Sequence, residues 1–237
     1  TEHDDHLRAF NEAFEFYGLD CYWDSKLYAE LLSVSGGKER LAFFIKKYKP
    51  DLLKSSSSLE IADIHRKKTD IFISKITDGL ISLRIGVERL IYEAKDNNLR
   101  LGIATTTSFE NVRAILESSL GRGAMNNFEI VGAGDVVKNK KPSPEIYNYV
   151  LKKMNLSADD CIAFEDSEIG FKASTASGLN TVVTLSEYTM ADNFKGALVV
   201  LDHLGEENQP FQMVYGMPTH HTMVCVEYLK ELYECTN

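Results

Sequence analysis

The sequence predicts an α/β fold in which a helical block comes first and a parallel sheet follows. Up to Asp78, apolar residues recur at the three- and four-residue spacing of helices, and no strand pattern appears. After Gly79, short apolar strands alternate with helices along the chain. Parallel strands need long crossover connections, so this alternation indicates a parallel sheet covered by helices on both faces.

The N-terminal block is expected to hold four helices. The first carries an apolar stripe at Leu7, Phe10 and Phe14, and Gly18 ends it. Two shorter helices follow, and a long fourth helix begins after the break at Pro50. The predicted helices cover 3–17, 24–32 and 38–48, and the fourth carries Leu59, Ile64, Ile71, Phe72 and Ile76.

The second block is expected to place each helix between two strands. Its strands are short runs of apolar residues, and its helices show apolar positions at helical spacing. The predicted strands are 101–104, 129–131, 161–164, 181–185 and 197–201, and the predicted helices are 87–94, 109–120, 144–154, a helix ending at 178, and 223–233. No role is predicted for the irregular segment from Glu206 to His221.

Composition narrows the kinds of partner. The 237 residues carry a formal charge of −9, which disfavours nucleic acid and anionic membrane as partners. Four widely spaced cysteines without a Cys-x-x-Cys pair predict reduced thiols and a cytoplasmic protein. No apolar run approaches membrane-spanning length. We expect a monomer whose partner is a small molecule.

Polar side chains follow three of the predicted strands. Thr105 to Ser108 lead into a helix whose N-terminus is suited to phosphate, although threonines also cap helices. Lys138 to Lys141 form a basic cluster that either meets a phosphate or is a solvated loop. Glu165 and Asp166 form either a metal-binding pair or the start of a helix cap. On one sheet edge, these groups are the parts needed for phosphoryl transfer.

As an ordered set, these motifs resemble those of the haloacid dehalogenase (HAD) superfamily. The matching runs are Ile103 to Thr107, Lys141 to Tyr147 and Glu165 to Gly170. The resemblance implies a HAD-like Rossmannoid parallel sheet core with an inserted helical cap domain. The expected domains are a cap at 3–78 and a core made of 1–2 and 79–237, with the first core strand absent from the sequence.

The N-terminal block resembles the cap of CbbY-type sugar-phosphate phosphatases, which are relatives of β-phosphoglucomutase. The similar positions are Thr1, Glu2, His6, Phe10, Asn11, Trp23, Asp24, Tyr28, Leu31, Leu32 and the run 36–40. The resemblance implies roles for single residues. Thr105 and Lys141 would be catalytic, and Glu165 and Asp166 would hold Mg²⁺. The implied contacts to the sugar phosphate come from Glu2, His6, Gly37, Lys38, Arg40 and Thr106.

The implied function is Mg²⁺-dependent hydrolysis of a small phosphorylated sugar, with xylulose-1,5-bisphosphate as a suggestive substrate, through a phosphoaspartate. The nucleophile would belong to an Asp-x-Asp-Gly strand upstream of Thr1, and Asp4 and Asp5 do not follow an apolar strand. Two alternatives remain at this stage. One is a β-phosphoglucomutase-like mutase, and the other is a non-catalytic protein that binds sugar phosphates.

Overall fold

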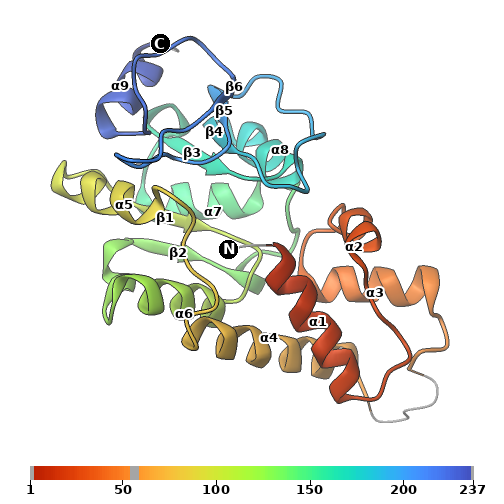
Figure 1. Cartoon of the computed structure of the whole chain (residues 1–237). Coiled ribbons are helices and arrows are strands. Elements are labelled where there is room, and N and C mark those ends of the chain that lie inside the picture. Colours follow the sequence, from red (N-terminus) through yellow and green to blue (C-terminus); the bar gives the residue numbers. More distant parts are fainter. Residues whose placement is uncertain (1–2, 54–58, 236–237) are drawn as a thin grey trace.

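The computed structural model describes residues 3–53 and 59–235 and consists of a helical part and an α/β part (Figure 1). The helical part contains α1 (His3–Phe16), α2 (Ser25–Leu31), α3 (Gly37–Tyr48) and α4 (Ile61–Thr77). Local chemistry sets the starts of these helices. Asp24 caps α2 by accepting a hydrogen bond from the Leu27 amide at 2.7 Å. A capping box between Glu60 and Asp63 starts α4.

Aromatic side chains form the core of the helical part. Trp23 is fully buried, and its ring lies 4.6 Å from that of Phe10 and 5.1 Å from that of Phe14. Phe44 of α3 packs edge-on against the same indole. The predicted helical block is therefore confirmed, and its helices enclose a core of their own.

The α/β part follows the predicted alternation of helices and strands. Helix α6 has the predicted bounds, and most other elements agree to within one or two residues. The elements are α5 (Val87–Asp96), β1 (Gly102–Ala104), α6 (Phe109–Leu120), β2 (Ile130–Gly132), α7 (Glu145–Met154), β3 (Ile162–Glu165), α8 (Glu168–Ala176), β4 (Asn180–Thr184), β5 (Val199–Leu201), β6 (Met213–Tyr215) and α9 (Val226–Glu234), with short 3-10 helices at Ala124–Asn127, Gly134–Val136 and Ala158–Asp160.

The strands form two sheets. In one, β1 and β2 pair in parallel, and in the other the order is β3-β4-β5-β6. Strands β3, β4 and β5 are parallel, as predicted, but β6 runs antiparallel to β5. The sequence interpretation missed β6, which lies in the segment from Glu206 to His221. Its three residues are too few to show an alternating pattern.

Helix α7 packs against both sheets. Its residues Ile146 and Tyr147 share a buried cluster with Ala163 of β3 and, at the margin, with Ala104 of β1. The carboxyl ends of β1 and β3 are thereby held near each other, although the two strands do not pair. Motifs that follow these strands consequently meet at one place.

A second cluster connects the helical part to the α/β part. Phe72 and Ile76 of α4 pack with Val112, Ile115 and Leu116 of α6. In Figure 1, α4 and α6 lie side by side below the sheets. All four cysteines are free thiols, as predicted. Among the described residues, no helix combines the length and apolarity needed to cross a membrane.

Candidate phosphate and metal site

Lys141 joins the ends of the two sheets. Its ammonium donates a hydrogen bond to the Ala104 carbonyl at the end of β1, at 3.0 Å. The same nitrogen lies 2.5 Å from Glu165 Oε1 at the end of β3. The Lys141 side chain is only 12% exposed. The structure therefore brings the three predicted motifs together, because Lys141 of one motif contacts residues of the other two.

Glu165 is a buried carboxylate with several neighbours. Besides Lys141, the Tyr147 hydroxyl donates a hydrogen bond to its Oε1. Burial raises the pKa of Glu165, and the nearby Asp166 raises it too, whereas the attraction of Lys141 opposes both. Gly170 is needed beside this carboxylate, because a Cβ there would lie 1.8 Å from Glu165 Oε2.

Asp166 differs from its neighbour. Ser167, rather than Asp166, caps α8 by accepting a hydrogen bond from the Gly170 amide at 3.3 Å. Within residues 3–53 and 59–235, no hydrogen bond or ion pair holds the half-buried Asp166 carboxylate. The helix-cap interpretation thus applies to Ser167, and Asp166 remains available to an external cation.

The two carboxylates fit a magnesium ion in number and kind. Mg²⁺ in phosphoryl-transfer sites is commonly bound by one or two carboxylates, while water and substrate phosphate complete its octahedron. The pair has no third carboxylate, histidine or cysteine close enough to form a ligand group among the described residues. Asp166 fits the role of a direct ligand, and Glu165 Oε1 is already occupied by Lys141 and Tyr147.

Thr105 lies directly after β1. Its amide donates to the Gly132 carbonyl of β2 at 2.9 Å, and its hydroxyl oxygen accepts from the Thr107 amide at 3.2 Å. Thr106 is half-buried in the same turn. Ser108 caps α6 by accepting a hydrogen bond from the Asn111 amide. The capping interpretation of the run Thr105 to Ser108 therefore applies to Ser108, and the phosphate-binding interpretation applies to Thr105.

Lys38 connects the helical part to the loop that follows β2. Its ammonium lies 3.0 Å from Asp135 Oδ2, and Lys140 lies 2.7 Å from the other oxygen of the same carboxylate. Hydrogen bonds from Lys140 and Lys38 lower the pKa of Asp135 to about 2. The predicted substrate residue Lys38 therefore lies next to the basic loop that carries Lys141.

Two further basic side chains lie beside His6 and Gly37, which are both predicted to contact the sugar phosphate. Lys68 Nζ is 2.8 Å from His6 Nδ1, and a Cβ on Gly37 would lie 2.5 Å from His65 Nε2. Burial and the nearby Arg40 lower the pKa of Lys68 to about 7. Burial, Lys68 and Lys38 lower the pKa of His65 to about 4. The group repels additional positive charge and favours an anion.

Arg40 is held within the helical part. Its guanidinium donates to the carbonyls of Leu31 and Val34 at 3.1 and 3.2 Å, and to the Tyr28 hydroxyl at 3.2 Å. Its predicted contact with substrate remains a prediction. Glu2, the other predicted contact at this end, lies outside the described residues.

Sequence reasoning did not assign a role to Tyr147, His65 or Lys68. Tyr147 belongs to the quoted motif that starts at Lys141, but its hydroxyl partner is 18 positions away. For Lys68, the sequence does contain a pattern that predicts burial. It lies four residues after Ile64 and four before Phe72, so helical geometry places it on the buried face of α4.

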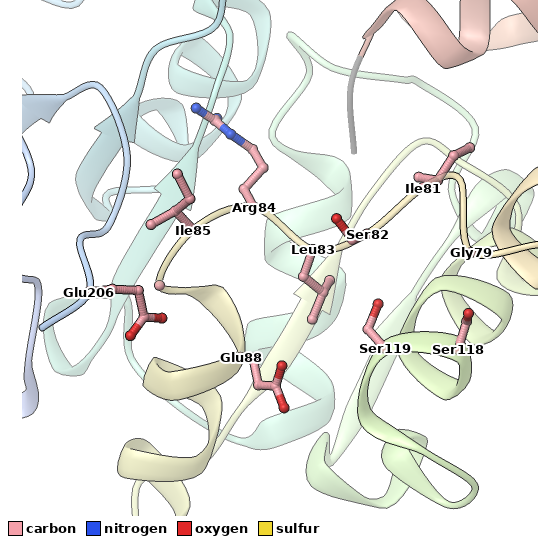
Figure 2. A pocket seen from close by; sticks show the side chains of 11 residues that line it. Gly79, Ile81, Ser82, Leu83, Arg84, Ile85, Glu88, Ser118, Ser119 and Glu206 are labelled. Carbon is pink, nitrogen blue, oxygen red and sulfur yellow. The ribbon is translucent and has the colours of Figure 1, made fainter. Parts of the chain in front are cut away.

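A separate pocket of about 390 Å³ lies between the segment 79–86, α6 and the start of α5 (Figure 2). None of the predicted site residues lines it. Its acidic groups are Glu88 and Glu206, and the Arg84 guanidinium is bound to the carbonyls of Leu185 and Asp202. This charge pattern disfavours a phosphate there, so we place the candidate site at Lys141 and Glu165.

Comparison with known sequences gives the following similarities. A family model described as haloacid dehalogenase-like hydrolase matches residues 2–184. Protein CbbY of Cereibacter sphaeroides is 43% identical over 201 residues, which cover 85% of this chain and 86% of that protein. The plasmid-encoded protein CbbY of Cupriavidus necator is 41% identical over 216 residues, which cover 91% of this chain and 83% of that protein.

Solved structures agree with these matches. A mutant of CbbY from Rhodobacter sphaeroides, in complex with xylulose-(1,5)bisphosphate, has a TM-score of 0.80 and 42% sequence identity. The match covers 84% of this chain and 87% of that one. β-Phosphoglucomutase from Clostridium difficile has a TM-score of 0.71 at 21% identity, covering 98% of this chain and 91% of that one, which is a likeness of fold alone.

Proposed function

This chain belongs to the haloacid dehalogenase-like hydrolase family, and on that premise we propose that it removes phosphate from a small phosphorylated sugar with the help of Mg²⁺. The observation that carries the proposal is the position of Lys141. Its ammonium lies between the ends of β1 and β3, 2.5 Å from Glu165 and 3.0 Å from the carbonyl of Ala104, the residue before Thr105. Nearby negative charge stabilises a buried ammonium, and Glu165 supplies it in this structure while a bound phosphate would add to it.

Each residue at this edge has a part in the proposed reaction. Lys141 neutralises charge on the transferring phosphoryl group, and the Thr105 hydroxyl orients one of its oxygens. Asp166 holds the metal, and Glu165 holds Lys141 in position with the help of Tyr147. When bound, Mg²⁺ would neutralise phosphate charge and favour attack on phosphorus.

The proposed nucleophile is an aspartate on a strand that lies between β1 and β3 and precedes Thr1. Each of these strands has one paired neighbour among the described residues, β2 for β1 and β4 for β3. Phe164 in the middle of β3 is 40% exposed, although a strand in an α/β core is normally covered on both faces. A strand at this position would cover Phe164 and place its last residue beside Lys141.

The proposed substrate carries a second phosphate. In the helical part, Lys68 lies 2.8 Å from His6, and the charges of Lys38 and Arg40 act on His65 and Lys68 respectively. Burial, followed by nearby positive charge, lowers the pKa values of Lys68 and His65, so a dianion beside them would stabilise their charged forms. The similar CbbY that binds xylulose-(1,5)bisphosphate supports a bisphosphate of this kind as the substrate class.

The test uses the full-length gene product and a panel of sugar phosphates. We expect Mg²⁺-dependent release of phosphate from xylulose-1,5-bisphosphate. Lys141→Ala should lower kcat by at least about 100-fold, because it removes a charge that stabilises the transition state. Asp166→Asn should abolish the dependence on Mg²⁺ together with most of the activity.

Lys138→Ala is the matched control, since Lys138 is exposed in the same loop and should leave kcat within about 2-fold. Activity that survives both Lys141→Ala and Asp166→Asn would refute the assignment. Formation of an isomerised sugar phosphate instead of free phosphate would identify a mutase. Saturable binding of the bisphosphate without turnover by the full-length protein would identify a non-catalytic binding protein.

A further inference from the structure

A second group of metal-ligating side chains lies at the start of α9, on the far side of the sheet β3-β4-β5-β6 from the helical part (Figure 1). His220 and His221 lie in the segment between β6 and α9, and Glu231 lies in the second turn of α9. The ligand atoms of these three residues all lie within 4.8 Å of one another. We call His220, His221 and Glu231 the α9 triad.

His221 is half-buried, and its Nε2 atom is removed from solvent. Its side chain is only 9% exposed, and Nε2 has no hydrogen-bond partner in the described part of the chain. The nearest acceptor, Glu231 Oε1, lies 3.1 Å from Nε2, but the pair lacks the alignment of a hydrogen bond. A buried polar atom without a hydrogen bond lowers the free energy of unfolding, so a ligand that binds Nε2 would stabilise the folded protein.

The separation of these two atoms fits two ligands of one ion. Zinc binds nitrogen and carboxylate oxygen at about 2.0 to 2.2 Å, and tetrahedral geometry then places the two ligand atoms roughly 3.3 Å apart. The 3.1 Å between Nε2 and Glu231 Oε1 is close to this value. An ion bound by both atoms would lie off the line that joins them.

The other ring nitrogen of His221 has a suitable neighbour. Nδ1 lies 3.6 Å from Cys225 Sγ, so a proton on Nδ1 can be donated to the sulfur. Metal-binding histidines usually donate their second ring N–H to an acceptor, which fixes the tautomer. In that tautomer the Nε2 lone pair faces the Glu231 carboxylate, and two lone pairs at this distance repel unless a proton or a metal ion lies between them.

We propose that the α9 triad binds one Zn²⁺ ion, with His220, His221 and Glu231 as ligands and water at the fourth position. Two imidazoles and a carboxylate suit zinc better than Mg²⁺, which prefers oxygen. The ion ties the end of the segment that holds β6 to α9. Its role is structural, since no residue of the phosphate and metal site takes part in it.

A second arrangement competes for the same histidine. His221, Cys225 and Glu227 also have ligand atoms within 4.8 Å of one another. We favour the α9 triad because, in the part of the chain that the structure describes, Nε2 rather than Nδ1 lacks a hydrogen bond. Glu227 and Glu231 lie one turn apart on α9, so substitution of each in turn distinguishes the two arrangements.

The experiment titrates the metal-free full chain with Zn²⁺ alone and follows the heat of binding and the melting temperature. We expect one ion per chain and a rise in Tm. His221→Asn and Glu231→Gln should each weaken Zn²⁺ binding at least ten-fold, whereas Glu227→Gln should leave it unchanged. Asp166→Asn should also retain this binding, which separates the α9 triad from the phosphate and metal site.

Cobalt substitution provides a second measurement that does not depend on stability. Co²⁺ bound by the α9 triad should show the absorption of a tetrahedral site without a sulfur-to-metal charge-transfer band. The proposal is overturned by the absence of saturable Zn²⁺ binding, by unchanged binding in Glu231→Gln, or by a strong charge-transfer band that Cys225→Ser removes.

Discussion

Lys141 and Lys68 are two lysines in this acidic chain whose ammonium groups are largely removed from water. Their ammonium groups have different neighbours. Lys141 has a carboxylate partner, Glu165, at 2.5 Å. Lys68 has a histidine nitrogen at 2.8 Å and lies over the rings of Phe10 and Phe72. Among the described residues Lys68 has no carboxylate partner, and burial together with the nearby Arg40 lowers its pKa to about 7.

This lowered pKa of Lys68 makes the stability of the protein depend on pH. Above about pH 7 the folded state holds a neutral amine, whereas the unfolded state keeps its proton up to about pH 10.5. The unfolded state then binds more protons, so the free energy of unfolding rises with pH between these values. Lys68→Met should remove this rise and stabilise the protein at and below neutral pH, by roughly a few kcal/mol.

Denaturant unfolding at pH 6 to 10 measures this effect. Lys67→Met is the matched control, because Lys67 is the adjacent residue and lies over Phe16 at 3.8 Å instead of in the core. It should leave the pH dependence as in the wild type. An unchanged slope in Lys68→Met would show that this lysine is not the group responsible.

At the scale of elements, α4 is the helix that connects the two parts. Its N-terminal half contributes Ile64 to the aromatic core around Trp23. Its C-terminal half contributes Phe72 and Ile76 to the cluster shared with α6. The predicted boundary between cap and core at residue 78 therefore follows a helix that packs against both parts. The division into cap and core remains a prediction.

Phe72→Ala tests whether α4 makes the two parts unfold together. Trp23 is the sole tryptophan, so its fluorescence reports the helical part, while far-UV circular dichroism reports the whole chain. We expect coincident transitions for the wild type. Phe72→Ala should cost about 3 to 5 kcal/mol and separate the two transitions.

Phe16→Ala is the control for this substitution, because Phe16 is 61% exposed on α1 and should change the free energy of unfolding by only about 0.5 kcal/mol. If the two probes already differ for the wild type, the shared cluster does not couple the parts. Coincident transitions in Phe72→Ala would mean that other contacts carry the coupling.

At the scale of the whole molecule, the two parts also meet through charge. The Asp135 carboxylate forms ion pairs with Lys38 of the helical part and with Lys140 of its own loop. The depressed pKa of Asp135 means that this contribution to stability is present above about pH 3.8 and is lost as pH falls toward about 2. The carboxylate is 70% exposed, so the contribution is small, below about 1 kcal/mol.

Asp135→Asn should accordingly lower stability slightly at neutral pH and reduce the loss of stability between about pH 4 and 2. High salt should diminish the difference from wild type, because exposed ion pairs are screened. Thermal unfolding at several pH values measures both effects. A variant that loses stability in acid as steeply as the wild type would rule out this carboxylate as a contributor.

The sequence by itself determined the class of fold, the order of its elements and the three motifs at the strand ends. Hydrophobic periodicity and motif spacing are local properties, so α6 and the parallel strands were predictable without coordinates. The family resemblance and the α/β class are confirmed by the matches to known proteins.

Only the tertiary structure decided which side chains share an environment. It placed the Tyr147 hydroxyl on Glu165, left Asp166 without a partner among the described residues, and brought His221 to Glu231. It also divided the strands into two sheets and added β6. Burial, pKa shifts and metal-ligand distances all depend on contacts between residues far apart in the chain, which no local pattern records.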